Sequence, residues 1–425
     1  MEIEENYGNY IEVEMGKEIY EGIILPSPEA GTFLLKLDNG YNIGFNKKDV
    51  LKMKLIKKIE EKKKEFEVKI SKDKPNVALV ILGGTIAARL NPGKGGVDFV
   101  ENPKDLFRFY PELFEIANVK KVEVPFMKGS ENMDYKDWKK TAKVICELVN
   151  EKEISGVIVL QGTDTLHYTS SALSFFLNNL GKPVVLTYSQ RSIDRGSSDA
   201  TLNLICSARA AISNFSGVLV VGHANTNDEF CLGISGTKVR KMHSSRRDAF
   251  KPVNAEPFMK IYSDRIERIS EHSLRNEKKK CALDNKFEEK IALLKFYPGQ
   301  NPAILDYYSK EGYKGIVIEM LGLGHVATSG GRLSWIKKLK EVQQKGIFIC
   351  AASQTIYGRL NPLVYVTGRE LLETGVIYLE DMLAEVAYVK LGWVLGHKEW
   401  AKSRETVKEK MLENIAGEIN KRLVE

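Results

Sequence analysis

The chain has 425 residues, about three times the size of a typical domain, so we expect two or three domains. It is 43% hydrophobic and 28% charged, and no apolar run approaches the roughly 18 residues of a transmembrane helix, which argues against a membrane span. The acidic first residues lack the features of a signal peptide. Five cysteines without a Cys-x-x-Cys pair favour a reducing, cytoplasmic setting over a disulfide framework or a zinc site: Cys146, Cys206, Cys231, Cys281 and Cys350.

The net charge of +7 is unevenly distributed along the chain. Residues 1–50 carry −6, residues 51–74 carry +5 and the remainder carries +8. Such asymmetry is typical of a docking surface or of a nucleic-acid partner, but solvated charge without any partner gives the same pattern. The charge alone leaves both interpretations open.

The first 75 residues differ in pattern from the rest. Short runs rich in aromatic and branched residues lie between residues 10 and 50, with the hairpin signal Asp38-Asn39-Gly40. They predict a small β-barrel over residues 1–60, which is either a docking module or a structural cap. Residues 61–75 carry dense alternating charge and predict a linker or exposed arm. The Lys62-Lys63-Lys64 run within it is either an RNA contact or a solvated surface.

From residue 76 onward, continuous apolar runs alternate with segments of helical spacing. Such runs are typical of parallel strands that are covered on both faces, and the alternation predicts a doubly wound α/β domain over residues 76–268. A polar stretch predicts a linker over 269–287, and a smaller α/β domain is expected over 288–425. The runs lie at 76–82, 156–160, 183–188, 217–222, 314–320 and 345–352, and the helices are expected near 135–150, 166–180, 200–214, 331–344 and 379–395.

Two strand ends carry unusual turns. Gly83-Gly84-Thr85 follows the first apolar run of the α/β domain, and Gly162-Thr163-Asp164 follows the second. Ligands of an open parallel sheet bind beyond the carboxyl ends of its strands, and glycine allows a ligand or another backbone to approach closely. Each turn alone is typical of an ordinary tight turn. Together they predict two threonine hydroxyls that face one cleft.

A threonine hydroxyl needs a base before it can act as a nucleophile at neutral pH. A lysine of lowered pKa can serve as that base when an acid holds it, and Asp164 is a candidate for this acid. The densest basic segment, residues 238–251, carries +5 and contains Lys238 and Lys241. The same segment is also consistent with an RNA-binding patch or with a surface strand of solvated lysines.

The sequence gives no indication of a metal or of a cofactor. The six histidines form no His-Glu-x-x-His motif and no cluster with cysteine. There is no phosphate-binding Gly-x-x-x-x-Gly-Lys loop, and Gly322-Leu323-Gly324 opens a dinucleotide-like motif whose next strand lacks the ribose-binding acid. We therefore expect no metal and no cofactor in this chain.

Five segments resemble, in order, the successive signatures of the L-asparaginase family. The likeness spans roughly residues 76–400, and the two threonine motifs are its most specific parts. These segments are ILGGTIA (81–87), LQGTDTLHYTSSAL (160–173), RKMHSSRRDAF (240–250), GLGHV (322–326) and VYVTGRELLETGVIYLEDMLAEVAYVKLGWVLG (364–396).

The resemblance implies a role for particular residues. The first threonine of the family falls on Thr85, and the second threonine with its aspartate falls on Thr163 and Asp164. The lysine falls on Lys241 rather than Lys238, because the nine-residue interval to the closing phenylalanine matches from Lys241. The family's substrate-binding pair falls on Ser130 and Glu131, and the turns at Gly84 and Gly162 are expected to contact the substrate and stabilise the oxyanion.

The family usually has a tyrosine on the loop after the first threonine, and residues 86–109 contain none. A tyrosine from elsewhere, such as Tyr110, or a different loop closure would have to replace it. Thr85 is expected to attack the side-chain amide with help from Thr163, Asp164 and Lys241, and the reverse assignment with Thr163 as nucleophile stays open.

The β-module and charged linker are not part of a plain asparaginase. With the asparaginase-like body they resemble the D subunits of archaeal-type glutamyl-tRNA(Gln) amidotransferases. This resemblance implies a homodimeric glutaminase that passes ammonia to an E subunit, which uses ATP and magnesium to convert Glu-tRNA(Gln) to Gln-tRNA(Gln). The alternatives are a free cytoplasmic L-asparaginase and an RNA-binding protein on an inactive asparaginase scaffold.

Overall fold

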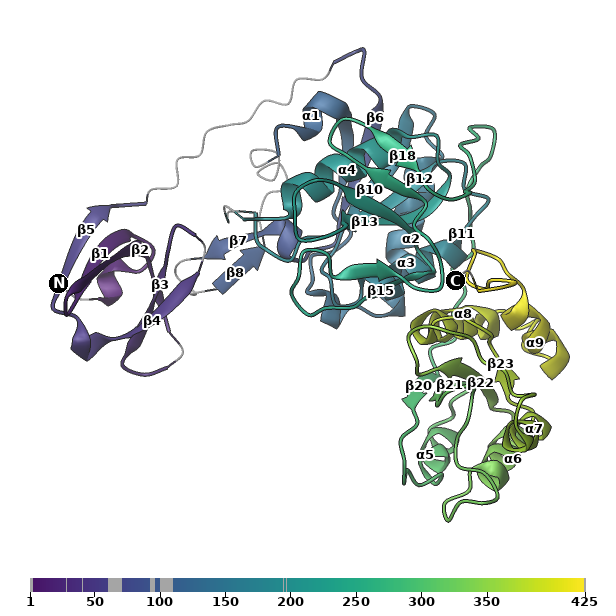
Figure 1. Cartoon of the computed structure of the whole chain (residues 1–425). Helices are drawn as coiled ribbons and strands as arrows, with labels where there is room; N and C mark the ends of the chain where they lie inside the picture. Colours follow the sequence, from purple (N-terminus) through teal and green to yellow (C-terminus); the bar gives the residue numbers. More distant parts are fainter. Residues whose placement is uncertain are drawn as a thin grey trace.

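The computed structural model describes residues 3–27, 29–39, 41–59, 71–91, 96–99, 110–193, 195 and 197–423. It contains an N-terminal module, a large sheet body and a C-terminal body, which follow one another along the chain (Figure 1). The Lys62-Lys63-Lys64 run and most of the expected linker lie outside the described residues. In the part of the chain that the structure describes, no helix is long and apolar enough to span a bilayer.

The N-terminal module is an antiparallel five-stranded sheet in the order β4-β3-β2-β1-β5. Alternate residues of β1 are buried, and Ile11 and Val13 pack with Ile24, Phe33 and Leu35 inside the curled sheet (Figure 1). The edge strands β4 and β5 are not hydrogen-bonded to each other among the described residues, and Phe45 of β4 and Met53 of β5 both pack against this apolar cluster. Its strands are β1 (Tyr10–Met15), β2 (Glu18–Pro26), β3 (Thr32–Lys36), β4 (Asn42–Asn46) and β5 (Lys52–Lys57).

The large sheet body is built on an eight-stranded sheet in the order β18-β17-β14-β13-β12-β10-β6-β9. The five strands from β13 to β9 are parallel and the other three are antiparallel. Its strands are β6 (Asn76–Ile81), β9 (Asn118–Glu123), β10 (Ile154–Leu160), β12 (Pro183–Thr187), β13 (Gly217–His223), β14 (Cys231–Ser235), β17 (Met259–Ile261) and β18 (Ile266–Arg268). Its helices are α1 (Leu113–Ile116), α2 (Tyr135–Val149), α3 (Leu166–Phe176) and α4 (Ala200–Ile212).

Both faces of this sheet are covered by helices, as the continuous apolar runs predict. Ala78 and Val80 of β6 belong to one apolar cluster with α2 and α3, whereas Val77 and Leu79 belong to a second cluster with α4. Successive side chains of a strand point to opposite faces, so a strand between two helical layers has no polar face. The doubly wound fold class is thereby confirmed.

Three short strand pairs surround the large sheet. They are β7 (Ala88–Asn91) with β8 (Gly96–Phe99), β11 (Leu177–Asn178) with β19 (Ala282–Leu283), and β15 (Val239–Lys241) with β16 (Phe250–Pro252). The polar stretch 269–287 is attached to the large body by β19 and by Arg275, whose guanidinium donates to the carbonyls of Ser155 and Ser213.

The C-terminal body is a four-stranded parallel sheet in the order β20-β21-β22-β23. Its helix α8 is buried on nearly all sides, because one apolar cluster continues from the large sheet through α3 into α8. The strands are β20 (Ile291–Lys295), β21 (Gly315–Met320), β22 (Phe348–Ser353) and β23 (Ile377–Tyr378), and the helices are α5 (Ile304–Lys310), α6 (Ile336–Gln344), α7 (Val366–Glu373), α8 (Ala384–Gly396) and α9 (Arg404–Leu412).

Candidate active site

The two glycine-threonine turns lie at the ends of neighbouring parallel strands. In the ladder between β6 and β10, Ile81 is opposite Leu160, and the Leu82 amide donates to the Leu160 carbonyl at 2.9 Å. Thr85 and Thr163 follow within four residues of these positions, in the loops that leave the same sheet edge. The register therefore brings the two predicted threonine motifs together.

Direct backbone contact between the turns requires glycine. Gly84 has φ +85°, and a Cβ added there would lie 2.2 Å from the amide nitrogen of Gly162. A Cβ added at Gly83 would lie 2.2 Å from the carbonyl oxygen of Lys128, so a third segment also passes close by. Because side chains at these positions would separate the segments, the glycines allow the threonines to share one site.

Lys241 connects the second threonine with its aspartate. Its Nζ lies 2.7 Å from Thr163 Oγ1 and 2.7 Å from Asp164 Oδ1. The lysine side chain is 12% exposed and that of Asp164 is 62% exposed, so the amine is sheltered while the carboxylate faces solvent. Lys238 instead reaches Asp381. The structure thus brings together three predicted residues that come from two distant segments.

Ser130 and Glu131 begin a single 3-10 turn beside these residues. Ser130 is buried, and its Oγ accepts a hydrogen bond from the Asp164 amide at 3.1 Å. The Thr165 hydroxyl donates to the Ser130 carbonyl at 2.7 Å. The Glu131 side chain is exposed and accepts from Asn132 at 3.1 Å. Thr165 was not predicted as a site residue, although it follows the Gly-Thr-Asp motif directly.

His167 lies in the first turn of α3, close to Lys241 and Asp164. Burial lowers its pKa to about 3, and the positive charges of Arg240 and Lys241 contribute to the same shift. The imidazole is therefore neutral at physiological pH. It acts as an uncharged part of the packing beside the site.

The cations of the basic segment 238–251 are all paired with acidic side chains. Each of its six lysines and arginines forms an ion pair with an aspartate or glutamate, which argues against a free cationic surface at this segment. The pairs are Lys238–Asp381, Arg240–Glu385, Lys241–Asp164, Arg246–Asp248, Arg247–Asp228 and Lys251–Asp248.

Tyr110, the candidate to replace the missing loop tyrosine, is 3% exposed. It packs in the apolar cluster that also contains Ile86 and Leu113. Its ring is therefore part of the core beneath the first threonine turn. Residues 92–95 and 100–109 of the intervening loop lie outside the described residues.

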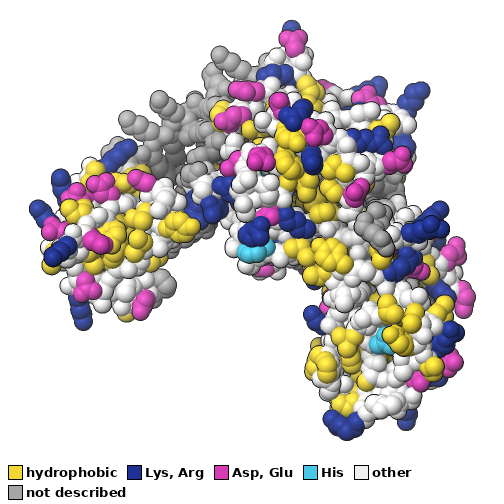
Figure 2. All heavy atoms as spheres, viewed as in Figure 1, with side chains coloured by type: hydrophobic (Ala, Val, Ile, Leu, Met, Phe, Trp, Pro, Cys, Tyr) yellow, Lys and Arg dark blue, Asp and Glu magenta, His cyan; other side chains and the backbone are white. Residues whose placement is uncertain are grey.

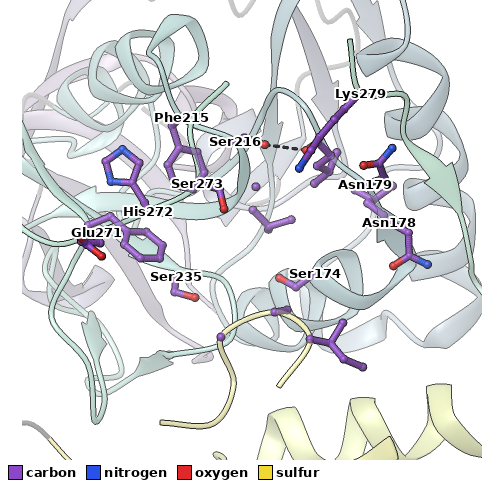
Figure 3. Close-up of a pocket in the computed structure, with 18 residues that line it drawn as sticks. Ser174, Asn178, Asn179, Phe215, Ser216, Ser235, Glu271, His272, Ser273 and Lys279 are labelled. Carbon is purple, nitrogen blue, oxygen red and sulfur yellow. Dashed lines mark hydrogen bonds between the residues drawn. The ribbon is translucent and has the colours of Figure 1, made fainter. Parts of the chain in front are cut away.

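A cavity of about 480 Å³ opens at the far end of α3, beside Ser174, Phe215 and His272 (Figure 3). None of the eight predicted site residues lines it. Over the described part of the chain, no group of three or more His, Cys, Asp or Glu side chains is arranged to hold a metal ion. The candidate active site is therefore defined by the convergence of side chains at the sheet edge.

Comparison with known families divides the chain into three matches. Residues 76–274 match the N-terminal domain of asparaginases, residues 290–411 match the glutaminase/asparaginase C-terminal domain, and residues 6–56 match the GatD N-terminal domain. The match to the GatD N-terminal domain covers the N-terminal five-stranded module, which lies outside both asparaginase matches.

Curated relatives match over nearly the whole chain. The D subunit of the glutamyl-tRNA(Gln) amidotransferase from Pyrococcus furiosus is 44% identical over 422 residues, which cover 97% of this chain and 94% of the relative. Its counterpart from Pyrococcus abyssi is 45% identical over 425 residues, covering 97% and 95%. This chain belongs to the family of glutamyl-tRNA(Gln) amidotransferase D subunits.

Solved structures show which part of this D-subunit family member is shared with asparaginases. The thermostable L-asparaginase from Thermococcus kodakarensis superimposes with a TM-score of 0.71 at 28% identity, covering 82% of this chain and 100% of that one. L-asparaginase I from Vibrio cholerae O1 gives a TM-score of 0.70 at 25% identity, covering 82% and 99%. Whole asparaginases thus account for the chain except for about a fifth of its length.

Proposed function

We propose that this D-subunit family member hydrolyses the side-chain amide of glutamine and supplies the ammonia to an E subunit. The E subunit activates Glu-tRNA(Gln) with ATP and magnesium, and the ammonia converts it to Gln-tRNA(Gln). The observation that carries the amide hydrolysis is the contact of Lys241 Nζ with both Thr163 Oγ1 and Asp164 Oδ1. The match of residues 6–56 to the GatD N-terminal domain supports the tRNA-dependent role.

In the proposed mechanism, the Thr85 hydroxyl attacks the amide carbon and loses its proton to the Thr163, Asp164 and Lys241 relay. The relay returns this proton to the leaving nitrogen. The C–N bond then breaks, ammonia departs, and the acyl group remains as an ester on Thr85. Water then attacks the ester and releases glutamate with the free hydroxyl. The closeness of Lys241 to Thr163 also fits the reverse assignment, in which Thr163 carries the ester.

Substrate binding is assigned to the residues around the two turns. Ser130, Glu131 and Asp164 would hold the α-carboxylate and α-ammonium of glutamine. Backbone amides at the Gly83-Gly84 and Gly162 turns would stabilise the oxyanion, and each such donor commonly contributes about 3 kcal/mol. The contact of the Asp164 amide with Ser130 Oγ supports a shared substrate cradle.

We assign partner docking to the N-terminal module, with domain boundaries at 1–60, 61–75, 76–268, 269–287 and 288–425. Hydrophobic side chains lie on the surface of this module (Figure 2), and Ile19, Tyr41 and Leu51 are each more than half exposed. A hydrolase that acts alone has no need of such a module.

A homodimer in the cytoplasm completes the proposed assembly, and the five free, buried cysteines are consistent with a reducing compartment.

A free asparaginase is the nearest competing function. Asparagine and glutamine differ by one methylene, which a pocket discriminates by only about 1–3 kcal/mol. The decisive experiment measures ammonia released from glutamine and from asparagine, with and without the E subunit and Glu-tRNA(Gln). Strong stimulation of glutamine hydrolysis by the partner supports the proposal, and an unstimulated preference for asparagine overturns it.

The nucleophile is tested by trapping the ester and mapping it by mass spectrometry. An adduct on the peptide containing Thr85 supports the proposed order of attack, whereas an adduct on the peptide containing Thr163 reverses it.

An RNA-binding role on an inactive scaffold predicts that the isolated chain shifts tRNA in a salt-dependent way and releases no ammonia. The paired cations of residues 238–251 favour the enzyme over this alternative.

A further inference from the structure

The contact of Lys241 with Thr163 and Asp164 joins β15 to the start of α3, and both of these elements contact α8 or the turn before it. α3 begins directly after Thr163-Asp164-Thr165, and it packs on α8 of the C-terminal body. Tyr168 meets Tyr388 edge-on at 6.2 Å between ring centroids, and Phe175 stacks on Trp393 at 5.7 Å. The threonine side of the contact is therefore held in place by α8.

β15, which carries Lys241, is held by the turn before α8 and by the first turn of this helix. Side chains alternate from Lys238 through β15. Lys238 and Arg240 reach the C-terminal body, whereas Val239 enters the core and Lys241 reaches the site. Lys238 Nζ lies 2.7 Å from Asp381 Oδ2, and Arg240 Nη2 lies 2.9 Å from Glu385 Oε1. Lys238 lies directly before β15 and Arg240 lies within it, two residues further on. Their partners Asp381 and Glu385 are four residues apart, in the turn before α8 and in its first turn.

The Lys238–Asp381 pair is enclosed. The two side chains are 2% and 0% exposed, and Asp381 also accepts from the backbone and side-chain amides of Asn420 at 2.9 and 2.8 Å. Burial lowers the pKa of Lys238, and the carboxylate of Asp381 opposes this shift. A buried charge is tolerated only with a hydrogen-bonded partner, so this pair fixes β15 against the turn before α8.

We propose that Asp381 and Glu385 are positioning residues for amide hydrolysis. Through Lys238 and Arg240 they fix the position of β15, and β15 in turn places Lys241 Nζ between Thr163 Oγ1 and Asp164 Oδ1. This inference rests on the proposed roles of those three residues in the active site. A displacement of α8 against β15 moves the amine relative to the hydroxyl, so the C-terminal body sets the geometry of the relay.

A double-mutant cycle on the less enclosed pair tests the inference. Arg240→Met, Glu385→Gln and the double variant are assayed for ammonia release from glutamine, as full chains with the E subunit and Glu-tRNA(Gln). We expect each single variant to lower kcat by about tenfold, with KM changed by less than about twofold, because the glutamine-holding Ser130 lies on another element. The double variant should lose no more than the worse single variant. Arg240→Lys should restore much of kcat, since one Nη2–Oε1 contact joins the pair.

Asp284→Asn is the matched control, because Asp284 pairs with His397 at the other end of α8 at 3.0 Å. It should leave kcat near the wild-type value. Wild-type kcat per folded molecule in both single variants, additive losses in the cycle, or an equal loss in the control would each overturn the positioning role. If Glu385→Gln does not fold, Arg240→Met and Arg240→Lys decide the question. Lys241→Met distinguishes a failure of the proposed function from a failure of the positioning role. Full activity of Lys241→Met refutes the proposed chemistry. An inactive Lys241→Met variant together with normal activity of Arg240→Met and Glu385→Gln refutes only the positioning role.

Discussion

Replacement of Lys241 by Met removes the base of the proposed relay and keeps an apolar stem of similar length. The lost amine lies 2.7 Å from both Thr163 Oγ1 and Asp164 Oδ1. A positioned acid–base group commonly contributes about 10²- to 10⁴-fold to the rate. We therefore expect kcat to fall by that factor, which corresponds to about 3–5 kcal/mol of activation free energy.

The stability of the variant should change much less. The Asp164 side chain is 62% exposed, and an ion pair with such a solvent-exposed member contributes about 0–1 kcal/mol to the free energy of unfolding. Loss of this pair therefore cannot account for a loss of activity through unfolding. The gap between the two effects distinguishes a catalytic lysine from a structural one.

Both quantities are measured on the same protein, as ammonia release in the presence of the E subunit and Glu-tRNA(Gln) and as urea unfolding. Lys251→Met is the matched control, because Lys251 lies opposite Arg240 on β16 and binds Asp248 and the Ala224 carbonyl. It should keep kcat near the wild-type value. A folded Lys241→Met protein that retains more than about a tenth of wild-type kcat refutes the relay.

Three further predictions concern the turn, the buried histidine and a buried ion pair. Gly84→Ala should abolish ammonia release because its Cβ would overlap the Gly162 backbone, whereas Gly312→Ala, at φ +75° with open space around it, should lose only the roughly 1–3 kcal/mol of backbone strain and keep its kcat. The pKa of His167 is lowered to about 3, so the unfolded chain binds one more proton between that value and about 6.5. The free energy of unfolding should therefore decrease as the pH is lowered through this range, by up to about 1.4 kcal/mol per pH unit, and urea titrations of His167→Leu should show a shallower slope; equal slopes would contradict the assignment. Glu418→Ala should cost about 3–5 kcal/mol of unfolding free energy, because it leaves Lys390 charged at a site where both side chains are 0% exposed. The Lys390→Met/Glu418→Leu double variant should lose less, and a greater loss than in Glu418→Ala would count against this interpretation.

Local pattern alone was sufficient for the fold class and for the two threonine turns. Apolar runs such as those before Thr85 and Thr163 predict covered parallel strands, and strands of one parallel sheet end at the same edge. The glycines were expected as tight turns, and the structure adds that Gly84 and Gly162 touch. These features depend on the periodicity of a few neighbouring residues.

The contacts of the basic segment could be established only from the tertiary structure. The residues before Phe250 contain two lysines in one short run, and only the fold shows that Lys238 meets Asp381 while Lys241 meets Thr163 and Asp164. The fold also shows that each cation of this segment is paired with an acid, and that Asp381 and Glu385 lie more than a hundred residues away in the chain.

The sequence by itself determined the family, the strand-end turns and the candidate residues, because these depend on residue types at short spacings. The tertiary structure decided which charges pair and which helix holds the site, because Coulomb and packing energies depend on distances in space, and long-range contacts such as Arg240–Glu385 leave no short-range periodicity to read.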